Sequence, residues 1–326
     1  MVIMTDPFIN LRPYNDSQLP AVLNSVAQDP YFAKVASFVY PDDSLEQCQQ
    51  RLCSIRSVDE LQFTFMKDVT ERLISATMDG FSYDGFSRLD SKSRYLFVSN
   101  HRDITLDAIL TDYATHFSGM MTPQITFGAN LMNVPLMADL GRANKIFQVE
   151  RGGTPREFYN NLMLVSSYIR HVITEEHQPV WIAQRNGRTK DGSDRTDPAI
   201  IKMFGMSSGK PLSDALKDLS IVPLAISYEW EPCDMLKAVE LYKRTQGPYS
   251  KQPGEDAHSV FTGLLQPKGR VHLQASSPIT PEELDACHND AKLIAALIDQ
   301  RISSNYRLNP CNYVASDLRD GSSRYS

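Results

Sequence analysis

The sequence predicts an α/β protein with a mixed central sheet flanked by helices, preceded by a helical region. Short apolar runs alternate with amphipathic helical patterns after residue 80, whereas earlier residues show helical periodicity alone. With 326 residues, 42% hydrophobic and 22% charged, the chain can bury a large core. We expect an N-terminal helical region at 1–80 and an α/β domain at 81–326.

The first 80 residues carry helical patterns at 20–27, 31–39 and 58–78. In the last of these, aliphatic and aromatic side chains recur at spacings of three and four, which predicts one face in the core. Contact of that face with an acyl chain or a bilayer is the alternative. Turn-forming residues between 80 and 93 predict a loop before the first strand.

The α/β region is predicted from apolar runs separated by helical patterns. One helix begins at Pro155, which suits a first helical turn. Strands are expected at 95–98, 122–127, 145–149, 179–183, 219–228 and 270–274, with helices at 104–110, 130–140, 155–172 and 281–303.

The strand at 95–98 runs into a polar turn that contains His101. Open α/β sheets bind ligands where a buried strand ends and the next helix begins. Asp103 and Asp107 follow closely, and either carboxylate could hold the imidazole in one tautomer and leave its other nitrogen free as a base. The structural alternative makes Asp103 a helix N-cap and Asp107 a partner of the helix dipole.

Two further strands end in polar runs, one at Arg151 and one at 184–196, which contains Arg188 and Lys190. Loops at one edge of a sheet would bring these side chains near His101. Arginine beside glycine suits a phosphate, whereas solvated surface charge is the alternative for each cation.

The charge distribution favours a small anionic ligand over nucleic acid. The segment 142–202 holds ten Lys or Arg against seven Asp or Glu, although the whole chain has a formal charge of -6. Five cysteines without C-x-x-C spacing indicate reduced thiols and no zinc site.

The chain shows neither a signal-peptide pattern nor a long apolar run. We expect a cytoplasmic protein whose membrane contact, if it has one, is peripheral at the inner face of the membrane. The amphipathic N-terminal helices are a possible docking face.

Four segments in order resemble a known family: NHRDITLD at 100–107, VER at 149–151, NGRT at 186–189 and IVPLAISY at 221–228. They are similar to the four blocks of the glycerol-3-phosphate and lysophosphatidic acid acyltransferases. The resemblance covers 95–228 and is closest to a soluble bacterial subgroup with NHRDI in its first block.

The resemblance implies that His101 is the catalytic base. The family has four residues between its His and Asp, whereas five lie between His101 and Asp107 and one lies between His101 and Asp103. An extra residue in the turn would make Asp107 the partner, because an apolar helix follows it. Asp103 remains the alternative.

The resemblance also implies that Arg151, Gly187 and Arg188 bind the phosphate of the acceptor, with Lys190 nearby. The family has a glutamate where this chain has Asn186. Loss of that carboxylate bears on recognition of the acceptor hydroxyl and on activity itself.

The predicted function is O-acyl transfer from acyl-CoA or acyl-carrier protein to a hydroxyl of a glycerol phosphate or lysophospholipid. Apart from the acyl donor, the chemistry needs no cofactor and no metal. The alternatives are a hydrolase of acyl thioesters or esters and a non-catalytic protein that binds lipid or acyl-carrier protein.

Overall fold

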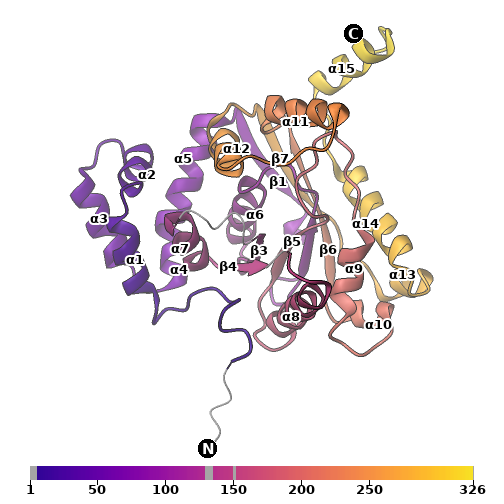
Figure 1. Cartoon of the computed structure of the whole chain (residues 1–326), viewed down its shortest axis with the longest axis horizontal. Coiled ribbons are helices and arrows are strands. Elements are labelled where there is room, and N and C mark those ends of the chain that lie inside the picture. Colours follow the sequence, from indigo (N-terminus) through magenta and orange to yellow (C-terminus); the bar gives the residue numbers. More distant parts are fainter. Residues whose placement is uncertain (1–5, 129–134, 150–151, 326) are drawn as a thin grey trace, which may run out of the picture.

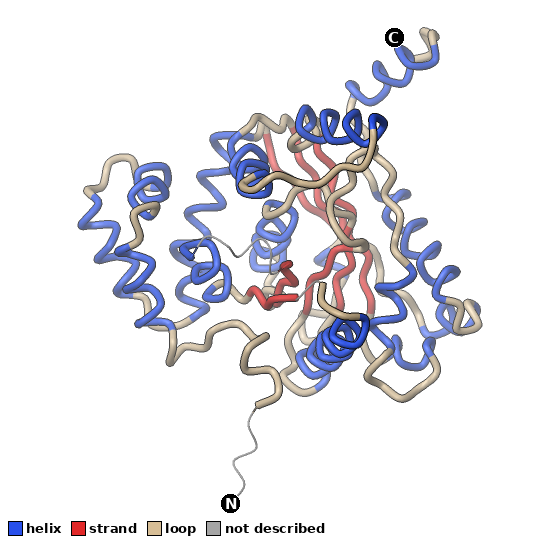
Figure 2. The backbone as a smooth tube through the Cα atoms, in the orientation of Figure 1, coloured by secondary structure: helices blue, strands red, loops and turns tan. Residues whose placement is uncertain are grey.

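A computed structural model describes residues 6–128, 135–149 and 152–325. Within these ranges, seven strands form one sheet in the order β1-β7-β6-β2-β5-β3-β4, with helices packed around it (Figures 1 and 2). The strands are β1 (Gly80–Asp84), β2 (Leu96–Ser99), β3 (Gln124–Gly128), β4 (Ile146–Val149), β5 (Val180–Ala183), β6 (Ile221–Tyr228) and β7 (Arg270–Ala275). The pair β6–β7 is antiparallel and the other pairs are parallel, so the predicted mixed sheet is confirmed.

The helices before the sheet are α1 (Leu19–Gln28), α2 (Phe32–Val39), α3 (Leu45–Ser54), α4 (Val58–Leu61) and α5 (Lys67–Thr77). Those that follow are α6 (Leu106–Phe117), α7 (Pro135–Ala143), α8 (Pro155–Thr174), α9 (Pro198–Gly205), α10 (Leu212–Lys217), α11 (Asp234–Gln246), α12 (Glu255–Leu265), α13 (Pro281–Ala286), α14 (Ala291–Asn305) and α15 (Pro310–Asp320). The short 3-10 turn Phe86–Arg88 links β1 to β2.

The predicted loop at 80–93 is wrong for its first five residues, because Gly80–Asp84 forms the edge strand β1. This strand pairs in parallel with β7. Its side chains alternate between exposed and half-buried positions, so it lacks the apolar run that marks the other strands. Pairing with a distant part of the chain decides its conformation.

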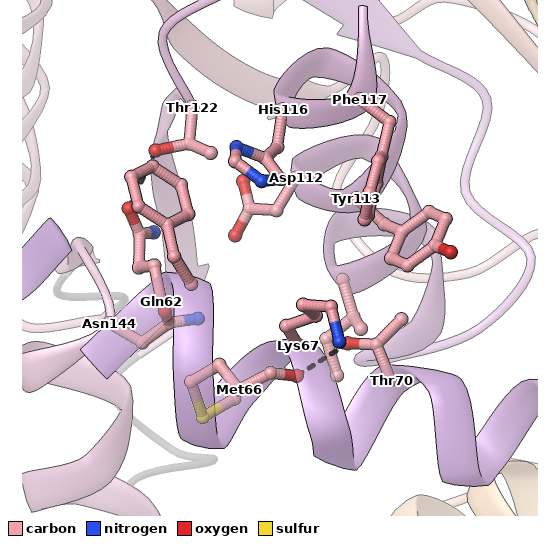
Figure 3. Close-up of a pocket in the computed structure, with 12 residues that line it drawn as sticks. Gln62, Met66, Lys67, Thr70, Asp112, Tyr113, His116, Phe117, Thr122 and Asn144 are labelled. Carbon is pink, nitrogen blue, oxygen red and sulfur yellow. Dashed lines mark hydrogen bonds between the residues drawn. The ribbon is translucent and has the colours of Figure 1, made fainter. Parts of the chain in front are cut away.

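The predicted helix at 58–78 is interrupted. A π-helical turn, Gln62–Met66, separates α4 from α5, and it places Gln62 and Met66 beside α6 (Figure 3). The predicted helix at 281–303 is likewise divided into α13 and α14. His288 and Asn289 lie in the turn between them with φ of 50° and 61°, which a helix does not accommodate.

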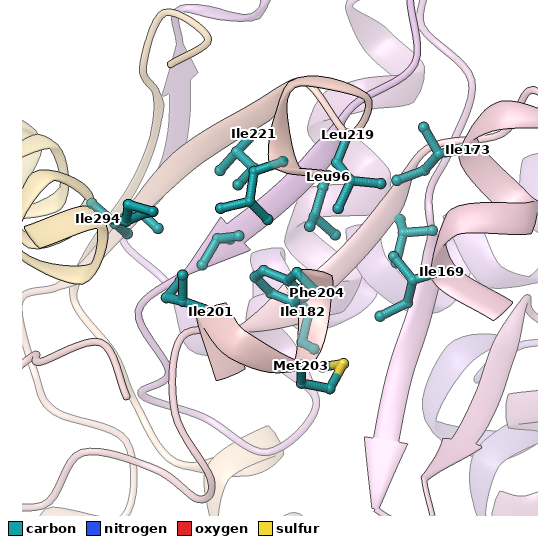
Figure 4. Packing of buried hydrophobic residues seen from close by; sticks show 14 of the residues in the cluster. Leu96, Ile169, Ile173, Ile182, Ile201, Met203, Phe204, Leu219, Ile221 and Ile294 are labelled. Carbon is teal, nitrogen blue, oxygen red and sulfur yellow. The ribbon is translucent and has the colours of Figure 1, made fainter. Parts of the chain in front are cut away.

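Every residue of β2 and β6 is buried. On one face, Leu96 and Ile182 pack with Ile169 of α8, Ile201 of α9 and Ile294 of α14 (Figure 4). On the N-terminal side, α1, α2 and α3 share a separate core with α7. The boundary at residue 80 remains a prediction.

Strands β2, β3, β4 and β5 run in the same direction, so their C-terminal ends open on one edge of the sheet. The turn with His101 follows β2, and the polar loop 184–197 follows β5. Within the described ranges, none of the helices combines the length and apolarity that a membrane crossing needs.

Candidate active site

His101 and Asp107 form the centre of the site. The Nδ1 atom of His101 lies 2.9 Å from Oδ2 of Asp107. The imidazole is largely buried, with 14% of its side-chain surface exposed, and it meets Trp181 edge to face at 6.0 Å. Because Nδ1 is engaged, Nε2 is the nitrogen left to meet a ligand.

The carboxylate of Asp107 is held from several sides. Its Oδ2 accepts hydrogen bonds from the backbone amides of Arg102 at 2.7 Å and Asp103 at 3.0 Å. Its Oδ1 accepts a hydrogen bond of 2.8 Å from the hydroxyl of Tyr228, at the end of β6. Burial and the Asp107 charge keep the pKa of Tyr228 well above its usual range, so the phenol stays a donor.

Asp103 has a different position. Its Oδ1 accepts from the backbone amides of Thr105 at 2.9 Å and Leu106 at 2.8 Å, at the start of α6. It therefore stabilises the turn that leads into this helix. Of the two aspartates considered from the sequence, the structure puts Asp107 against the imidazole.

The turn is fixed to the neighbouring strands by Asn100 and Arg102. The amide of Asn100 exchanges hydrogen bonds with the backbone of Ile226 in β6, at 2.8 and 3.0 Å. The guanidinium of Arg102 lies 2.7 Å from Asp194 in the loop after β5 and 3.2 Å from Glu231. The backbone amide of Thr189, also in that loop, donates to the carbonyl of His101 at 2.8 Å.

A cavity of about 310 Å³ opens beside His101. One part is apolar, with walls from α8, α9 and the ends of β3 and β4. The other part is polar and comes mainly from the loop after β5. Its lining includes the predicted site residues His101, Asn186, Gly187, Arg188 and Lys190, and also Phe127, Val149, Phe158, Leu162, Val165, Trp181, Arg185, Ile200, Met203, Lys251 and Asp256.

Arg188 and Lys190 differ in how far their charges are already paired. Nη1 of Arg188 is buried and has no hydrogen-bond partner among the described residues. Lys190 instead forms a 2.5 Å ion pair with Glu240 of α11. Burial lowers the pKa of Lys190. Burial alone would raise the pKa of Glu240, but hydrogen bonds from Lys190 and Arg244 lower it. Arg188 is thus the cation better prepared for an anionic ligand.

Asn186 and Gly187 lie exposed at the rim of the cavity. Gly187 has a φ of 77°, a left-handed conformation that favours glycine, so the turn itself calls for this residue. Arg151, the other predicted phosphate ligand, lies outside the described residues.

Sequence reasoning missed Tyr228, Asp194 and Glu231. Tyr228 lies at the end of a predicted buried strand. Because a buried phenol needs a hydrogen-bond partner, a tyrosine at this position indicated that its hydroxyl would bond to a polar group nearby. Asp194 and Glu231 gave no such signal, since their pairing with Arg102 depends on two loops that meet in the fold.

Comparisons with known proteins relate this chain to acyltransferases. A model of the acyltransferase family matches residues 81–227. A glycerol-3-phosphate acyltransferase of Pseudoalteromonas translucida (strain TAC 125) is 22% identical over 273 residues, covering 79% of this chain and 32% of the relative. The chain therefore spans about a third of the length of this curated relative.

Among solved structures, the chain is similar to the 1-acyl-sn-glycerophosphate (LPA) acyltransferase PlsC from Thermotoga maritima. The TM-score is 0.45 at 12% sequence identity, and the match covers 90% of this chain and 99% of that one.

Proposed function

This chain belongs to the acyltransferase family through its residues 81–227, and we propose that it transfers a fatty acyl group from acyl-CoA or acyl-carrier protein to a hydroxyl of a glycerol-phosphate or lysophospholipid acceptor. The observation that carries the proposal is the hydrogen bond between His101 and Asp107 at the wall of a cavity. This cavity is apolar on one side and lined by cationic side chains on the other.

In this mechanism, Nε2 of His101 takes the proton from the acceptor hydroxyl while the oxygen attacks the thioester carbonyl. The tetrahedral intermediate then expels the thiolate, which receives the proton back from the imidazolium. Asp107 orients the ring and stabilises its positive charge, and the amides of Arg102 and Asp103 with the Tyr228 hydroxyl hold Asp107 in place.

The polar side of the cavity suits the acceptor. The buried Nη1 of Arg188 lacks a hydrogen-bond partner among the described residues, and a phosphate oxygen would supply one. We propose Arg151 as a second phosphate ligand, with Gly187 and Asn186 at the rim and Lys190 supporting the loop through Glu240. Binding the phosphate brings the hydroxyl to His101, which raises the rate by proximity.

The apolar side suits the acyl chain of the donor. Phe127, Leu162, Val165 and Met203 line it, and their surface loses contact with water when a chain enters. A hydrolase would use the same His101 to activate water. The buried Nη1 of Arg188, which has no partner among the described residues, favours the transferase, since water needs no phosphate ligand.

The test measures thiol release from acyl-CoA and acyl-carrier-protein donors, with and without glycerol-3-phosphate or lysophosphatidic acid. Acceptor-dependent release should fall by about 10²–10⁴-fold in His101→Ala. Arg188→Gln should raise the KM for the acceptor more than it lowers kcat. Release that needs no acceptor would favour the hydrolase, and binding of donor without any turnover would favour a carrier-binding protein.

We also propose peripheral membrane contact, through α11 and α12 instead of the N-terminal helices. The apolar sides of α1, α2 and α3 are used in their own core. Large apolar side chains are instead exposed on α11 and α12, and Lys251 and Asp256, from the same stretch of chain, line the cavity. A bilayer bound there would lie near the site that takes the lipid acceptor. The exposed side chains are Met235, Val239, Tyr242, Phe261 and Leu265.

Vesicle co-sedimentation of the whole chain tests this contact. The double variant Met235→Glu and Tyr242→Glu should reduce binding to vesicles of anionic phospholipid. The control is Leu318→Glu on α15, which places the same charge on an exposed apolar side chain outside α11 and α12. It should leave binding unchanged. Equal binding of both variants would refute the assignment to α11 and α12.

A further inference from the structure

A second cavity lies on the other side of α6, between this helix and the N-terminal helical region. Its volume is about 30 Å³, more than the roughly 10–15 Å³ that a bound water molecule needs, so it has room for a small ion or a water molecule. Figure 3 shows Asp112 and His116 of α6 on one side, and Gln62, Thr122 and Asn144 on the other.

Four side-chain atoms of residues that line this cavity are buried without a hydrogen-bond partner among the described residues. Neither carboxylate oxygen of Asp112 has a hydrogen bond among the described residues, nor do Oδ1 of Asn144 and Nε2 of Gln62. Gln62 and Asn144 are each 6% exposed, so solvent does not serve them. Buried polar groups in folded proteins are normally satisfied, which indicates that a bound species completes this site.

The chemistry of the unpartnered atoms selects that species. Three of them are acceptor oxygens, two from a carboxylate and one from an amide. Rotation of the Gln62 amide by half a turn would add a fourth oxygen and direct Nε2 to the Thr122 hydroxyl, which now donates to Gln62 at 2.7 Å. A set of oxygens around one buried negative charge suits a hard cation.

Among the described residues, the charged side chains near Asp112 form no hydrogen bond or ion pair with its carboxylate. Lys145 is directed to the Thr122 hydroxyl at 2.9 Å, and its carboxylate neighbour is Asp59 at 3.9 Å. Lys67 is paired with Glu71 at 2.8 Å. His116 stacks on Phe63, with ring centroids 4.1 Å apart. Burial raises the pKa of Asp112 far more than the charge of Lys145 lowers it.

We propose that this cavity binds a single oxygen-coordinated metal cation, held by the Asp112 carboxylate and the side-chain oxygens of Asn144 and Gln62. The described residues contain no cluster of three His, Cys, Asp or Glu side chains, so the amide oxygens are essential to this site. The cation joins Gln62 of the N-terminal π-helical turn to α6, the helix that also carries Asp107. This inference does not depend on the acyl-transfer proposal.

Thermal unfolding of the whole chain tests the site. Protein freed of metal with a chelator is measured in choline chloride, and then with NaCl, KCl, MgCl₂ or CaCl₂ at matched ionic strength. We expect one of these cations to raise Tm saturably, by about 2–5 °C. Asp112→Asn should abolish the rise, because the amide cannot neutralise a cation. Asp285→Asn, which removes an exposed charge, is the control and should keep it.

Asn144→Ala and Gln62→Ala keep the carboxylate, and each should raise the half-saturating cation concentration by about tenfold. These variants also serve if Asp112→Asn does not fold. Wild-type protein whose Tm responds to no cation would mean that the cavity holds water, and the proposal would be wrong. An equal Tm rise in Asp112→Asn would place the cation elsewhere and overturn it as well.

Discussion

Two carboxylates of the same helix, Asp107 and Asp112, lie in opposite environments. Asp107 is 1% exposed and accepts hydrogen bonds from His101, two backbone amides and the Tyr228 hydroxyl. The oxygens of Asp112 are also shielded from solvent, yet no described residue bonds to them. Burial by itself therefore does not identify a functional carboxylate. The donors around the carboxylate determine what it can do.

The two aspartates also differ in where their binding partners come from. The partners of Asp107 are groups of this protein, and in the proposed mechanism Asp107 holds the His101 side chain that meets substrate. Asp112 lacks such partners, and a buried unpaired carboxylate is costly. Its place in the fold makes sense when a bound species supplies the missing contacts.

The largest expected effect comes from exchanging each aspartate for asparagine. Asp107→Asn should lower kcat for acyl transfer by about 10²–10⁴-fold, because the amide cannot stabilise the imidazolium of His101. Asp112→Asn should stay within about threefold of wild type when both are saturated with cation or both are free of it. Steady-state kinetics on folded variants measures both. Equal losses of kcat in the two variants would mean that Asp107 and Asp112 do not differ in their contribution to catalysis.

Gly263→Ala tests how tightly the turn around Asp107 is packed. A Cβ at Gly263 in α12 would lie 2.0 Å from Oδ2 of Asp103, whose backbone amide donates to Asp107. We expect unfolding free energy to fall by about 1–3 kcal/mol and activity to fall with it.

Gly205→Ala is the matched control for that variant. Gly205 is also helical, but its closest neighbour is the flexible end of Leu212 at 2.8 Å. Denaturant unfolding should show a clearly smaller loss for this variant. If the two glycine variants lost the same unfolding free energy, the close approach of α12 to Asp103 would not contribute to stability.

The pH dependence of stability sharpens the description of Asp112. Burial raises its pKa in the folded chain above the unfolded value near 3.9. Between the two values the folded state binds more protons, so the stability contributed by Asp112 falls as pH rises through this range. Cation-free Asp112→Asn should therefore gain stability relative to wild type as pH rises, by about 1–3 kcal/mol at neutral pH.

Urea unfolding of both proteins from pH 4 to pH 8 measures this difference. The nearby titratable groups, Lys145 and His116, are present in both, so their effects largely cancel. A difference that stays constant with pH would show that Asp112 ionises as readily in the fold as in water.

The smallest effect is expected for Tyr228→Phe. This change removes one donor from Asp107 and leaves the ring in place, so unfolding free energy should fall by about 0.5–1.5 kcal/mol. Activity should fall much less than in Asp107→Asn, because the two backbone amides remain. A loss as large as that of Asp107→Asn would mean that the phenol itself takes part in the reaction.

The sequence alone predicted a mixed sheet, its strands other than β1, the turn with His101 and the clustering of polar loops at one sheet edge. These features follow from local patterns: apolar runs, a polar turn and helical periodicity. The same reasoning predicted that His101, Arg188 and Lys190 would come together, and in the structure they line one cavity.

Only the tertiary structure decided what depends on distant parts of the chain. The choice between Asp107 and Asp103 beside His101 depends on how the turn folds and on Tyr228 of β6. The strand β1 exists because β7 pairs with it. The unpartnered atoms around this cavity come from three separate segments, which hold Gln62, Asp112 and Asn144. Hydrogen bonds and burial between such segments leave no periodic signal in the sequence, so they become visible when the chain is folded.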